Sequence, residues 1–207
     1  KEFPKCHLTI DPGYTPEILE SLRNNKVDVV VTWAMAPEPD FHFTPLFEDE
    51  LFFMVSPDHP WAKAGRIKRT EVGRQQYILF NASTSWHQSQ SSSQFSSYNS
   101  IYKQIEKYFN YEGVVLKSVL DVGSVSAIKE LVKLGLGITI LAPWVAQSEL
   151  SEKTLIALPL GRRKLKRKWG VLHWEGRPMG WAGETFIKLC QSSTRQFAAR
   201  NGLKANS

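Results

Sequence analysis

The amino-acid sequence predicts an α/β fold. Segments with strand signals alternate with segments of helical periodicity along the first two-thirds of its 207 residues. Val27–Trp33 and Leu51–Val55 are apolar runs with almost no polar alternation, which is typical of parallel strands buried on both faces. Gly135 and Gly137 separate a helical pattern from a third apolar run. These three observations favour strands and helices that alternate around a largely buried sheet.

Two strands and one helix are predicted before residue 34. Apolar and polar residues alternate over Cys6–Ile10, which predicts a short strand. Thr15, Pro16 and Glu17 then have the order of a helix start, with a capping hydroxyl, a proline at the first helical position and an acid in the first turn. The apolar run Val27–Trp33 follows this helix as the second strand.

A serine-rich segment, with nine serines in Ser83–Ser100, follows the predicted strand Tyr77–Phe80. Large apolar side chains recur through it and beyond it at three- and four-residue steps. One face of a helix would therefore be apolar, and the serines would occupy the opposite face and the entry turn. We predict a helix here and not a disordered linker. Its apolar stripe consists of Phe95, Tyr98, Tyr102, Ile105 and Phe109.

The rest of the chain predicts four more strands and two more helices. One helix opens at Ser124, and its apolar residues are expected to face inward; they are Ile128, Leu131, Val132 and Leu134. The other helix starts after Gly180. The predicted strands are Val114–Leu120, Ile138–Leu141, Leu155–Leu160 and Trp169–Trp174.

Composition excludes several classes of protein. Hydrophobic residues make up 42% and charged residues 22%, which is ordinary for a globular protein and not for a disordered chain. No uninterrupted apolar run approaches the roughly 18–20 residues of a membrane-spanning helix, and no apolar signal-peptide stretch follows Lys1. Cys6 and Cys190 are too few for a disulfide scaffold. We therefore expect a reducing, cytoplasmic location.

The net charge of +6 comes from one short segment. Six of the seven residues 162–168 are Lys or Arg, and the rest of the chain is balanced. Because no aromatic stacking pattern accompanies this run, a solvated strand edge or loop is favoured over a phosphate-binding patch. Asp49 and Glu50 are likewise expected to be solvated charges at a strand edge.

The sequence contains no signature of catalysis, of a metal site or of a cofactor site. No two of the five histidines have metal-ligand spacing, and the two cysteines are far apart. Gly135 and Gly137 resemble part of a dinucleotide fingerprint, but they lead from helix to strand and predict a helix stop. No nucleophile elbow or phosphate loop occurs. We therefore predict a protein that is not an enzyme and has no cofactor and no metal.

Two predicted strand-to-helix junctions are rich in hydroxyl groups. In an open α/β sheet such junctions meet at the carboxyl ends of the strands, where ligands bind. Free backbone N–H groups and the positive end of the helix dipole there suit a small anion. The alternative is that the hydroxyls are only helix caps. The residues are Asn81, Ser83, Thr84, Ser85, Gly123 and Ser124.

Three ordered stretches resemble the effector-binding domain of LysR-type transcriptional regulators. They are Leu22–Asn25 with Asp28–Val31, Pro45–Val55 with Asp58–Ala62, and Ala127–Ile138 with Pro143 and Trp144. Each stretch alone is moderately specific, but three in order at fitting spacing form a strong likeness. The resemblance runs from about Phe3 to Leu189.

The resemblance implies a fold and a set of partners. It implies two Rossmann-like lobes joined by two crossing strands, similar to type 2 periplasmic binding proteins. Residues 1–60 and 173–207 would form the first lobe, and residues 61–172 the second. A small-molecule inducer would bind in the cleft between the lobes of a homodimer or homotetramer and would alter the geometry of the oligomer.

The family's ligand-lining positions can be carried over by matching position. They fall after the strand Val27–Trp33 and at the same two hydroxyl-rich junctions. The candidate ligand-binding residues are thus Thr32, Trp33, Ala34, Asn81, Ser83, Thr84, Ser85, Gly123, Ser124 and Val125.

Two parts of the family pattern are missing from this chain. The winged helix-turn-helix that precedes the domain in the family is absent, so DNA would be bound only through that missing amino-terminal domain. The first strand and helix of the first lobe are missing as well, because Phe3 and Pro4 match a point beyond them. We therefore expect a truncated or proteolysed product.

Two other functions are compatible with the same fold. A periplasmic-type solute-binding protein shares the two lobes and the cleft, but it would require a secretory signal. A metabolic enzyme, or an allosteric domain of one, would require a cluster of charged catalytic residues that the sequence does not contain. The order of the three motifs favours the regulator.

Overall fold

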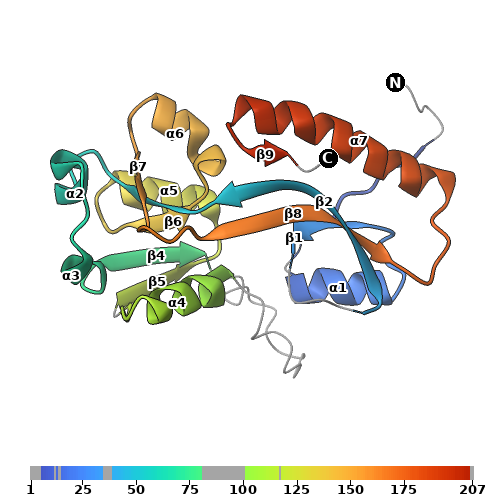
Figure 1. Ribbon diagram of the computed structural model, residues 1–207, viewed down its shortest axis with the longest axis horizontal. Coiled ribbons are helices and arrows are strands. Elements are labelled where there is room, and N and C mark those ends of the chain that lie inside the picture. Colours follow the sequence, from blue (N-terminus) through green and yellow to red (C-terminus); the bar gives the residue numbers. More distant parts are fainter. Residues whose placement is uncertain are drawn as a thin grey trace. The chain divides into compact units, whose positions relative to one another are not determined.

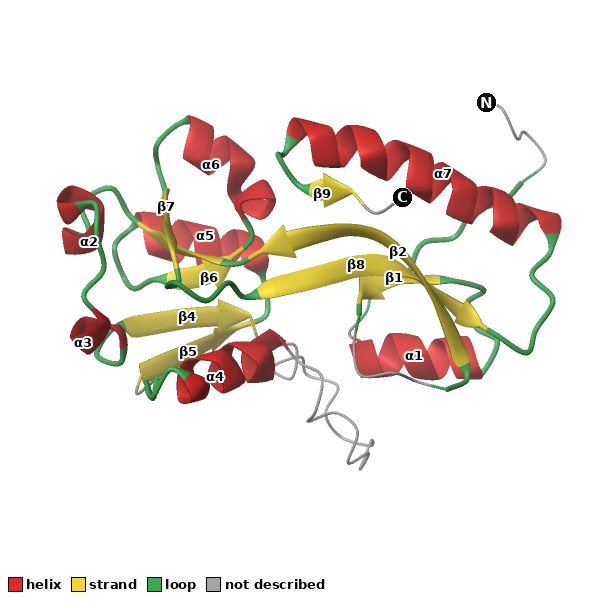
Figure 2. Cartoon of the chain, viewed as in Figure 1, coloured by secondary structure: helices red, strands yellow, loops and turns green. Residues whose placement is uncertain are grey.

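The computed structural model describes residues 6–11, 13, 15–34, 39–80, 101–116 and 118–205. The chain forms two compact units. Unit 1 consists of residues 1–49 and 167–207, and unit 2 consists of residues 50–166. Figure 2 shows that helices and strands alternate along the chain, which confirms the predicted α/β class. The chain passes from one unit to the other within two strands, β2 and β8.

Unit 1 contains a four-stranded sheet in the order β1-β8-β2-β9. Its elements are α1 (Thr15–Arg23), β1 (Val30–Trp33), β2 (Phe41–Glu50), β8 (Lys166–Trp174), α7 (Trp181–Arg200) and β9 (Lys204–Ala205). β1 pairs with β8, and β2 with β9, in antiparallel register. Ring contacts of Phe41 with Trp174 and of Phe47 with Trp169 occur in opposite order along β2 and β8, so these two central strands are also antiparallel.

The two helices of unit 1 lie on opposite sides of this sheet (Figure 1). From α1, Leu19 and Leu22 are buried in one apolar cluster with Val30 and Leu172. α7 packs on the other side through Phe197, whose ring meets that of Phe47 edge-on at 5.4 Å. Each buried large side chain contributes roughly 1.5–3 kcal/mol to folding, so both helices are held by packing and not by helix propensity.

The described residues of unit 2 form five strands. Its elements are β3 (Phe52–Val55), α2 (Pro60–Ala64), α3 (Arg69–Val72), β4 (Gln76–Phe80), α4 (Ile101–Tyr111), β5 (Ser118–Val122), α5 (Val125–Lys133), β6 (Thr139–Leu141), a 3-10 helix (Pro143–Ala146), α6 (Gln147–Ser151) and β7 (Ile156–Pro159). β4 and β5 are parallel, whereas β3 pairs antiparallel with β6 and β7. A parallel bridge between Tyr77 and Ile138 joins the two sets.

Alternating residues of the strands of unit 2 enter two apolar clusters. Phe53 and Tyr77 pack with α4 in the larger cluster. Met54, one position further along β3, packs with Ile128 and Val132 of α5 in the other. Because successive strand side chains point to opposite faces, α4 and α5 cover opposite faces of the sheet.

Most of the predicted elements are present, with shifted ends. α1, β3, β4, β6, β7, β8 and α7 lie where strands and helices were predicted. The predicted strand 114–120 is displaced, since β5 starts only at Ser118, and the strand β2 was not predicted. In the predicted serine-rich helix, α4 carries Tyr102 and buries Ile105 and Phe109, while Phe95 and Tyr98 lie outside the described residues.

Expectations for three of the predicted segments were wrong. Cys6–Ile10 has no regular secondary structure and is exposed, because no described strand pairs with it. β1 is not buried on both faces: it pairs with one strand among the described residues, and Val31 is 49% exposed. Leu134, expected to face inward from α5, is 73% exposed, because it lies after the last helical residue.

Gly135 and Gly137, which follow α5, have different structural roles. Gly135 has a φ of +75° and ends the helix, as predicted. Gly137 is not a helix stop. A Cβ atom there would lie 2.7 Å from the carbonyl oxygen of Gln76 and 3.0 Å from Ile78 Cγ1, so Gly137 permits β4 to approach closely.

The basic segment is only partly the solvated loop that was predicted. Arg163 forms a salt bridge with Glu112 at 3.2 Å and stacks over the ring of Tyr108, and Lys164 pairs with Glu50 at 2.8 Å. These side chains stay partly exposed and anchor the segment to unit 2. Much of its charge is therefore balanced locally, which agrees with the absence of a phosphate-binding pattern.

Candidate ligand-binding site

The first group of candidate residues lies at the end of β1 in unit 1. Thr32 is buried, and Trp33 and Ala34 are half-buried. The Ala34 N–H donates to the carbonyl oxygen of Lys168, so this strand end is fixed to β8. These three residues therefore occupy a rigid position on the sheet.

Trp33 belongs to a cluster of buried polar and aromatic groups. Its ring meets that of Trp169 edge-on, with the centroids 5.5 Å apart. The guanidinium of Arg167 lies 5.6 Å from the Trp33 ring and 5.3 Å from the Trp169 ring. Arg167 and Trp169 both donate hydrogen bonds to the Asp49 carboxylate. Arg167 donates from Nε at 2.9 Å and from Nη2 at 2.6 Å, and Trp169 donates from Nε1 at 2.9 Å.

The expectation that Asp49 is a solvated strand-edge charge was wrong. Asp49 as a whole residue is 2% exposed, and the side chain of Arg167 is only 9% exposed. The reason is the bidentate pairing of carboxylate and guanidinium, which compensates the loss of solvation of both charges. For Arg167 the predicted solvated location of the basic run was wrong for the same reason.

The indole N–H of Trp33 is a buried donor that finds no acceptor among the described residues. Its Nε1 atom is inaccessible to solvent. A buried N–H group that lacks a partner costs about 1–3 kcal/mol, so such groups call for an explanation. A bound molecule that supplies an acceptor oxygen would satisfy this donor.

The second group of candidate residues lies in unit 2, after β5. β4 and β5 run parallel and end together, with Phe80 paired to Val122. The two strands therefore end at the same edge of the sheet, as expected for parallel strands. Gly123 and Ser124 are exposed, and Val125 is half-buried. The residues of the other junction, Asn81, Ser83, Thr84 and Ser85, lie outside the described residues.

Ser124 is the N-cap of α5. Its hydroxyl oxygen accepts a hydrogen bond from the Ala127 N–H at 3.4 Å. The alternative that the hydroxyls cap helices is therefore confirmed for Ser124. An N-cap leaves other N–H groups of the first turn free for a ligand, so capping and ligand binding are compatible.

α5 is held to α6 by a largely buried ion pair. Lys129 Nζ lies 2.8 Å from Glu149 Oε1, and Lys133 lies 3.8 Å from the same oxygen. The hydrogen bond from Lys129 holds the pKa of Glu149 below its ordinary value, so the carboxylate stays ionised. This pair fixes the helix that carries Ser124 and Val125.

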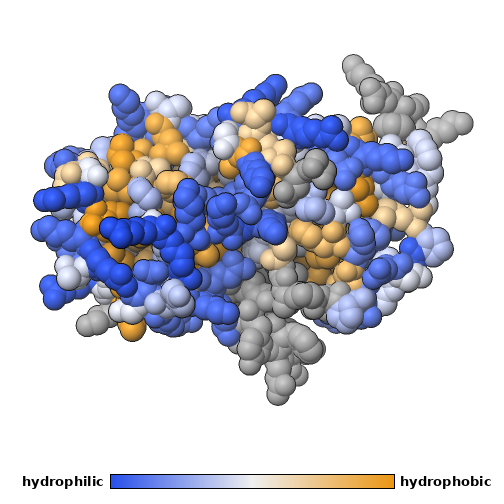
Figure 3. All heavy atoms as spheres, in the orientation of Figure 1, coloured by the Kyte–Doolittle hydropathy of each residue, from blue (hydrophilic) through white to orange (hydrophobic). Residues whose placement is uncertain are grey.

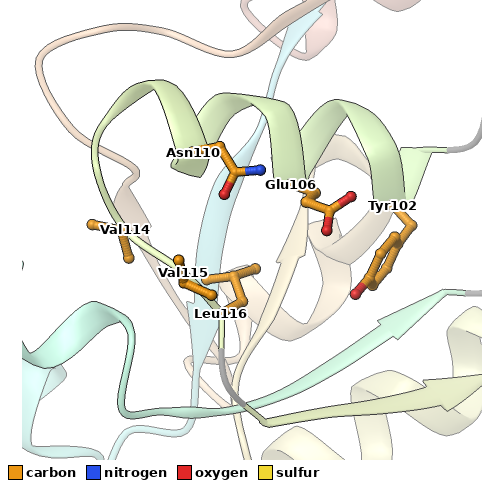
Figure 4. A pocket seen from close by; sticks show the side chains of 6 residues that line it. All are labelled: Tyr102, Glu106, Asn110, Val114, Val115 and Leu116. Carbon is orange, nitrogen blue, oxygen red and sulfur yellow. The ribbon is translucent and has the colours of Figure 1, made fainter.

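A small hollow in unit 2 contains none of the candidate residues. Figure 4 shows Tyr102, Glu106 and Asn110 on α4 and, facing them, Val114, Val115 and Leu116 on the segment that follows this helix. The hollow has room for only a few water molecules and is too small for a metabolite. On the face drawn in Figure 3, hydrophilic residues cover much of the surface and apolar residues gather in separate patches.

None of the helices described is both long enough and apolar enough to span a membrane. No three His, Cys, Asp or Glu side chains in the described ranges lie close enough together to hold a metal ion.

Sequence reasoning missed three residues around Trp33. Asp49 and Arg167 were interpreted as solvated charges, and Trp169 as an ordinary strand residue. The alternation of Arg167 with Trp169 in β8 was an available signal, since residues two apart share a strand face. Their carboxylate partner is 118 positions away in the chain, and no local pattern shows it.

The chain matches a family of known proteins over most of its length. The family model described as the LysR substrate binding domain covers residues 1–195. This chain belongs to that family. The match confirms the resemblance found in the sequence.

Curated relatives of this LysR substrate-binding domain are named as transcriptional regulators. A probable RuBisCO transcriptional regulator of Cyanidium caldarium is 23% identical over 192 residues, which cover 90% of this chain and 56% of the relative. The HTH-type transcriptional regulator MetR of Escherichia coli K12 is 21% identical over 192 residues, 93% of this chain and 55% of the relative. The domain thus spans little more than half the length of these relatives.

Solved structures confirm the fold of the domain. The regulatory domain of MetR from Neisseria meningitidis superposes with a TM-score of 0.73 at 16% identity, covering 100% of this chain and 87% of that one. The regulatory domain of CcmR from Synechocystis PCC6803, in complex with 2-PG, gives 0.70 at 22% identity, covering 86% and 79%. The effector-binding domain of QuiR, in complex with shikimate, gives 0.69 at 22% identity, covering 89% and 79%. The predicted fold, similar to type 2 periplasmic binding proteins, is confirmed.

Proposed function

We propose that this chain is the inducer-sensing domain of a LysR-type DNA-binding transcriptional regulator. The observation that carries the proposal is the match of the family model to residues 1–195. Units 1 and 2 correspond in this proposal to the two lobes. The units divide at residues 49/50 and 166/167, whereas the sequence placed the lobe boundaries near residues 60 and 172. DNA is bound by an amino-terminal domain outside this chain, and the regulator acts in the cytoplasm as a homodimer or homotetramer. The domain itself has no catalytic role.

The proposed ligand is a small organic acid. The indole N–H of Trp33 has no partner among the described residues, and the first turn of α5 has no acidic residue, so both places offer donors that suit a carboxylate. Two solved regulatory domains of the same fold hold small molecules, shikimate and 2-PG. The ligand-contacting residues proposed are Thr32, Trp33, Ala34, Asn81, Ser83, Thr84, Ser85, Gly123, Ser124 and Val125.

A change of one tryptophan tests this ligand site. A panel of small carboxylic acids that includes shikimate is first screened by thermal unfolding, where a ligand at 100 times its Kd stabilises by about 2.7 kcal/mol. Trp33→Phe keeps an aromatic ring but removes the N–H donor, so we expect it to bind the best acid about tenfold more weakly in calorimetry. Trp181→Phe is the matched control, because Trp181 is 67% exposed on α7.

Two outcomes would contradict the proposed ligand site. An acid bound equally well by wild type and Trp33→Phe would show that the indole N–H does not contact it. A panel in which no carboxylic acid raises the unfolding temperature would remove the organic acid as the ligand class. Neither outcome would affect the assignment to the family.

The assignment as a DNA-binding regulator is tested by the sequence of the native polypeptide upstream of Lys1. We expect an amino-terminal sequence determined on the native protein to contain a winged helix-turn-helix, and a gel-shift assay with that protein to show binding to DNA next to its own gene. A secretory signal in that position would contradict the proposal. It would instead favour a periplasmic-type solute-binding protein, although the curated relatives named above are all transcriptional regulators.

A further inference from the structure

Two histidines face each other across the central strands of unit 1. His42 is the second residue of β2, and His173 is the second-last residue of β8. Their ring centroids are 5.0 Å apart, and the ring planes are tilted by 37°. Next to them the Glu175 N–H donates to the carbonyl oxygen of Asp40 at 3.0 Å, which fixes the alignment of the two strand ends. The pair is thus held by the backbone of the sheet.

The separation of the two rings matches that of imidazoles sharing one metal ion. A zinc–nitrogen bond of about 2.0–2.1 Å places each ring centroid about 3.2 Å from the ion, so nitrogen–metal–nitrogen angles of about 90–109° separate the centroids by about 4.5–5.2 Å. The observed 5.0 Å lies within this interval. His42 is exposed, so its ring is free to turn toward a common ion without displacing packed neighbours.

The hydrogen bond of His173 leaves its Nε2 nitrogen available to bind a metal ion. His173 Nδ1 lies 3.3 Å from the carbonyl oxygen of Trp174. A carbonyl oxygen only accepts, so Nδ1 carries the proton in this bond and Nε2 keeps its lone pair. Metal-binding histidines commonly donate their second N–H to a backbone carbonyl in this way, which orients the ring.

The surroundings of the pair are acidic. Asp40 and Glu175 lie two positions from His42 and His173, just beyond the ends of β2 and β8. Both acidic residues are exposed. Their negative potential favours a dication at the neighbouring imidazoles. Because the described residues offer no group of three ligands, water would complete the coordination of any ion bound by the two rings.

We propose that His42 and His173 form a two-histidine site for a divalent transition-metal ion. Neutral imidazole suits nickel, copper and zinc ions, whereas calcium and magnesium prefer oxygen ligands. An ion at this position joins β2 to β8 and stabilises unit 1, since it binds the folded state alone. The site is separate from the residues proposed to contact the inducer, so it does not depend on the proposed function.

The test is calorimetric titration of the chain with nickel chloride near neutral pH. Wild type is expected to bind one Ni²⁺ with saturation below about 1 mM, and His42→Ala and His173→Ala each to weaken binding by at least about tenfold. His7→Ala is the matched control, because His7 is exposed and lies next to Cys6, a competing ligand. In NMR spectra of wild type, substoichiometric Ni²⁺ is expected to broaden the ring signals of His42 and His173 first, a result that needs no variant to fold.

Three results would overturn the site. One is a titration of wild type that shows no saturable binding below about 1 mM. Another is an unchanged Kd in both His42→Ala and His173→Ala. The third is loss of binding in His7→Ala, accompanied by broadening of the His7 ring signals, which would place the ion beside Cys6.

Discussion

Replacing Asp49 by alanine is expected to lower the free energy of unfolding of unit 1 by about 3–5 kcal/mol. The Asp49 side chain is fully buried and accepts hydrogen bonds from Arg167 and from Trp169. Without it the Arg167 guanidinium, whose side chain is 9% exposed, becomes a buried charge with no counter-ion. Urea unfolding followed by tryptophan fluorescence measures the loss, because Trp33 and Trp169 surround the pair.

The matched control is an exposed ion pair one position further along β2. Glu50 pairs with Lys164 at 2.8 Å, but the lysine side chain is 61% exposed, so we expect Glu50→Ala to cost at most about 1 kcal/mol. A double variant, Asp49→Leu with Arg167→Met, is expected to recover much of the stability, because it removes both buried charges together. Equal costs for Asp49→Ala and Glu50→Ala would refute the buried-pair interpretation.

The parts of the fold that could be predicted are those with local signals. The helix-start pattern at Thr15–Glu17 located α1, which begins at Thr15 itself, the residue predicted to cap it. β3 is an apolar run that is central and buried in the structure. α5 is bounded by Ser124 and Gly135, whose capping roles depend on side-chain and backbone geometry alone. Such signals are independent of distant partners, and they located these elements correctly. The parallel pairing expected for β3 was wrong, because β3 pairs antiparallel with β6 and β7.

The parts that could not be predicted depend on distant residues. β2 contains a proline and a run of three acidic residues, which local propensity assigns to a loop. It is a strand because β8, more than a hundred positions later, supplies its neighbour, and Asp49 is buried because Arg167 belongs to that neighbour. Conversely, the alternation of Cys6–Ile10 has no described partner strand, and a strand pattern without a partner does not form a strand.

In the candidate site, too, some features have local signals in the sequence and others depend on distant residues. That β4 and β5 end at one edge could be predicted from the general geometry of parallel strands. The cluster around Trp33 and the facing rings of His42 and His173 could not, since each joins residues of different strands. The sequence shows residue types, and the sheet register decides which of them meet.

Phe53→Ala is expected to cost about 3–5 kcal/mol of stability in unit 2. The Phe53 side chain is completely buried, and its ring contacts those of Trp61, Tyr77 and Phe109 at centroid distances of 5.3, 6.4 and 5.9 Å. Alanine would leave a cavity between rigid rings that cannot collapse into it. Phe52→Ala is the matched control: Phe52 is only half-buried and packs in the other cluster, so we expect a loss of about 1–2 kcal/mol.

Hydrogen-exchange mass spectrometry shows where the Phe53→Ala loss occurs. Phe53 and its three ring partners all belong to unit 2, and unit 1 has an apolar cluster of its own around Leu19, Leu22 and Leu172. If the cores are energetically separate, faster exchange is confined to peptides from residues 50–166, while peptides from α1 and α7 keep their protection. Asp49→Ala should then give the reverse pattern, with faster exchange in unit 1. An equal loss of protection in both units for either variant would show one cooperative core, and the proposal of two lobes with separate cores would fail.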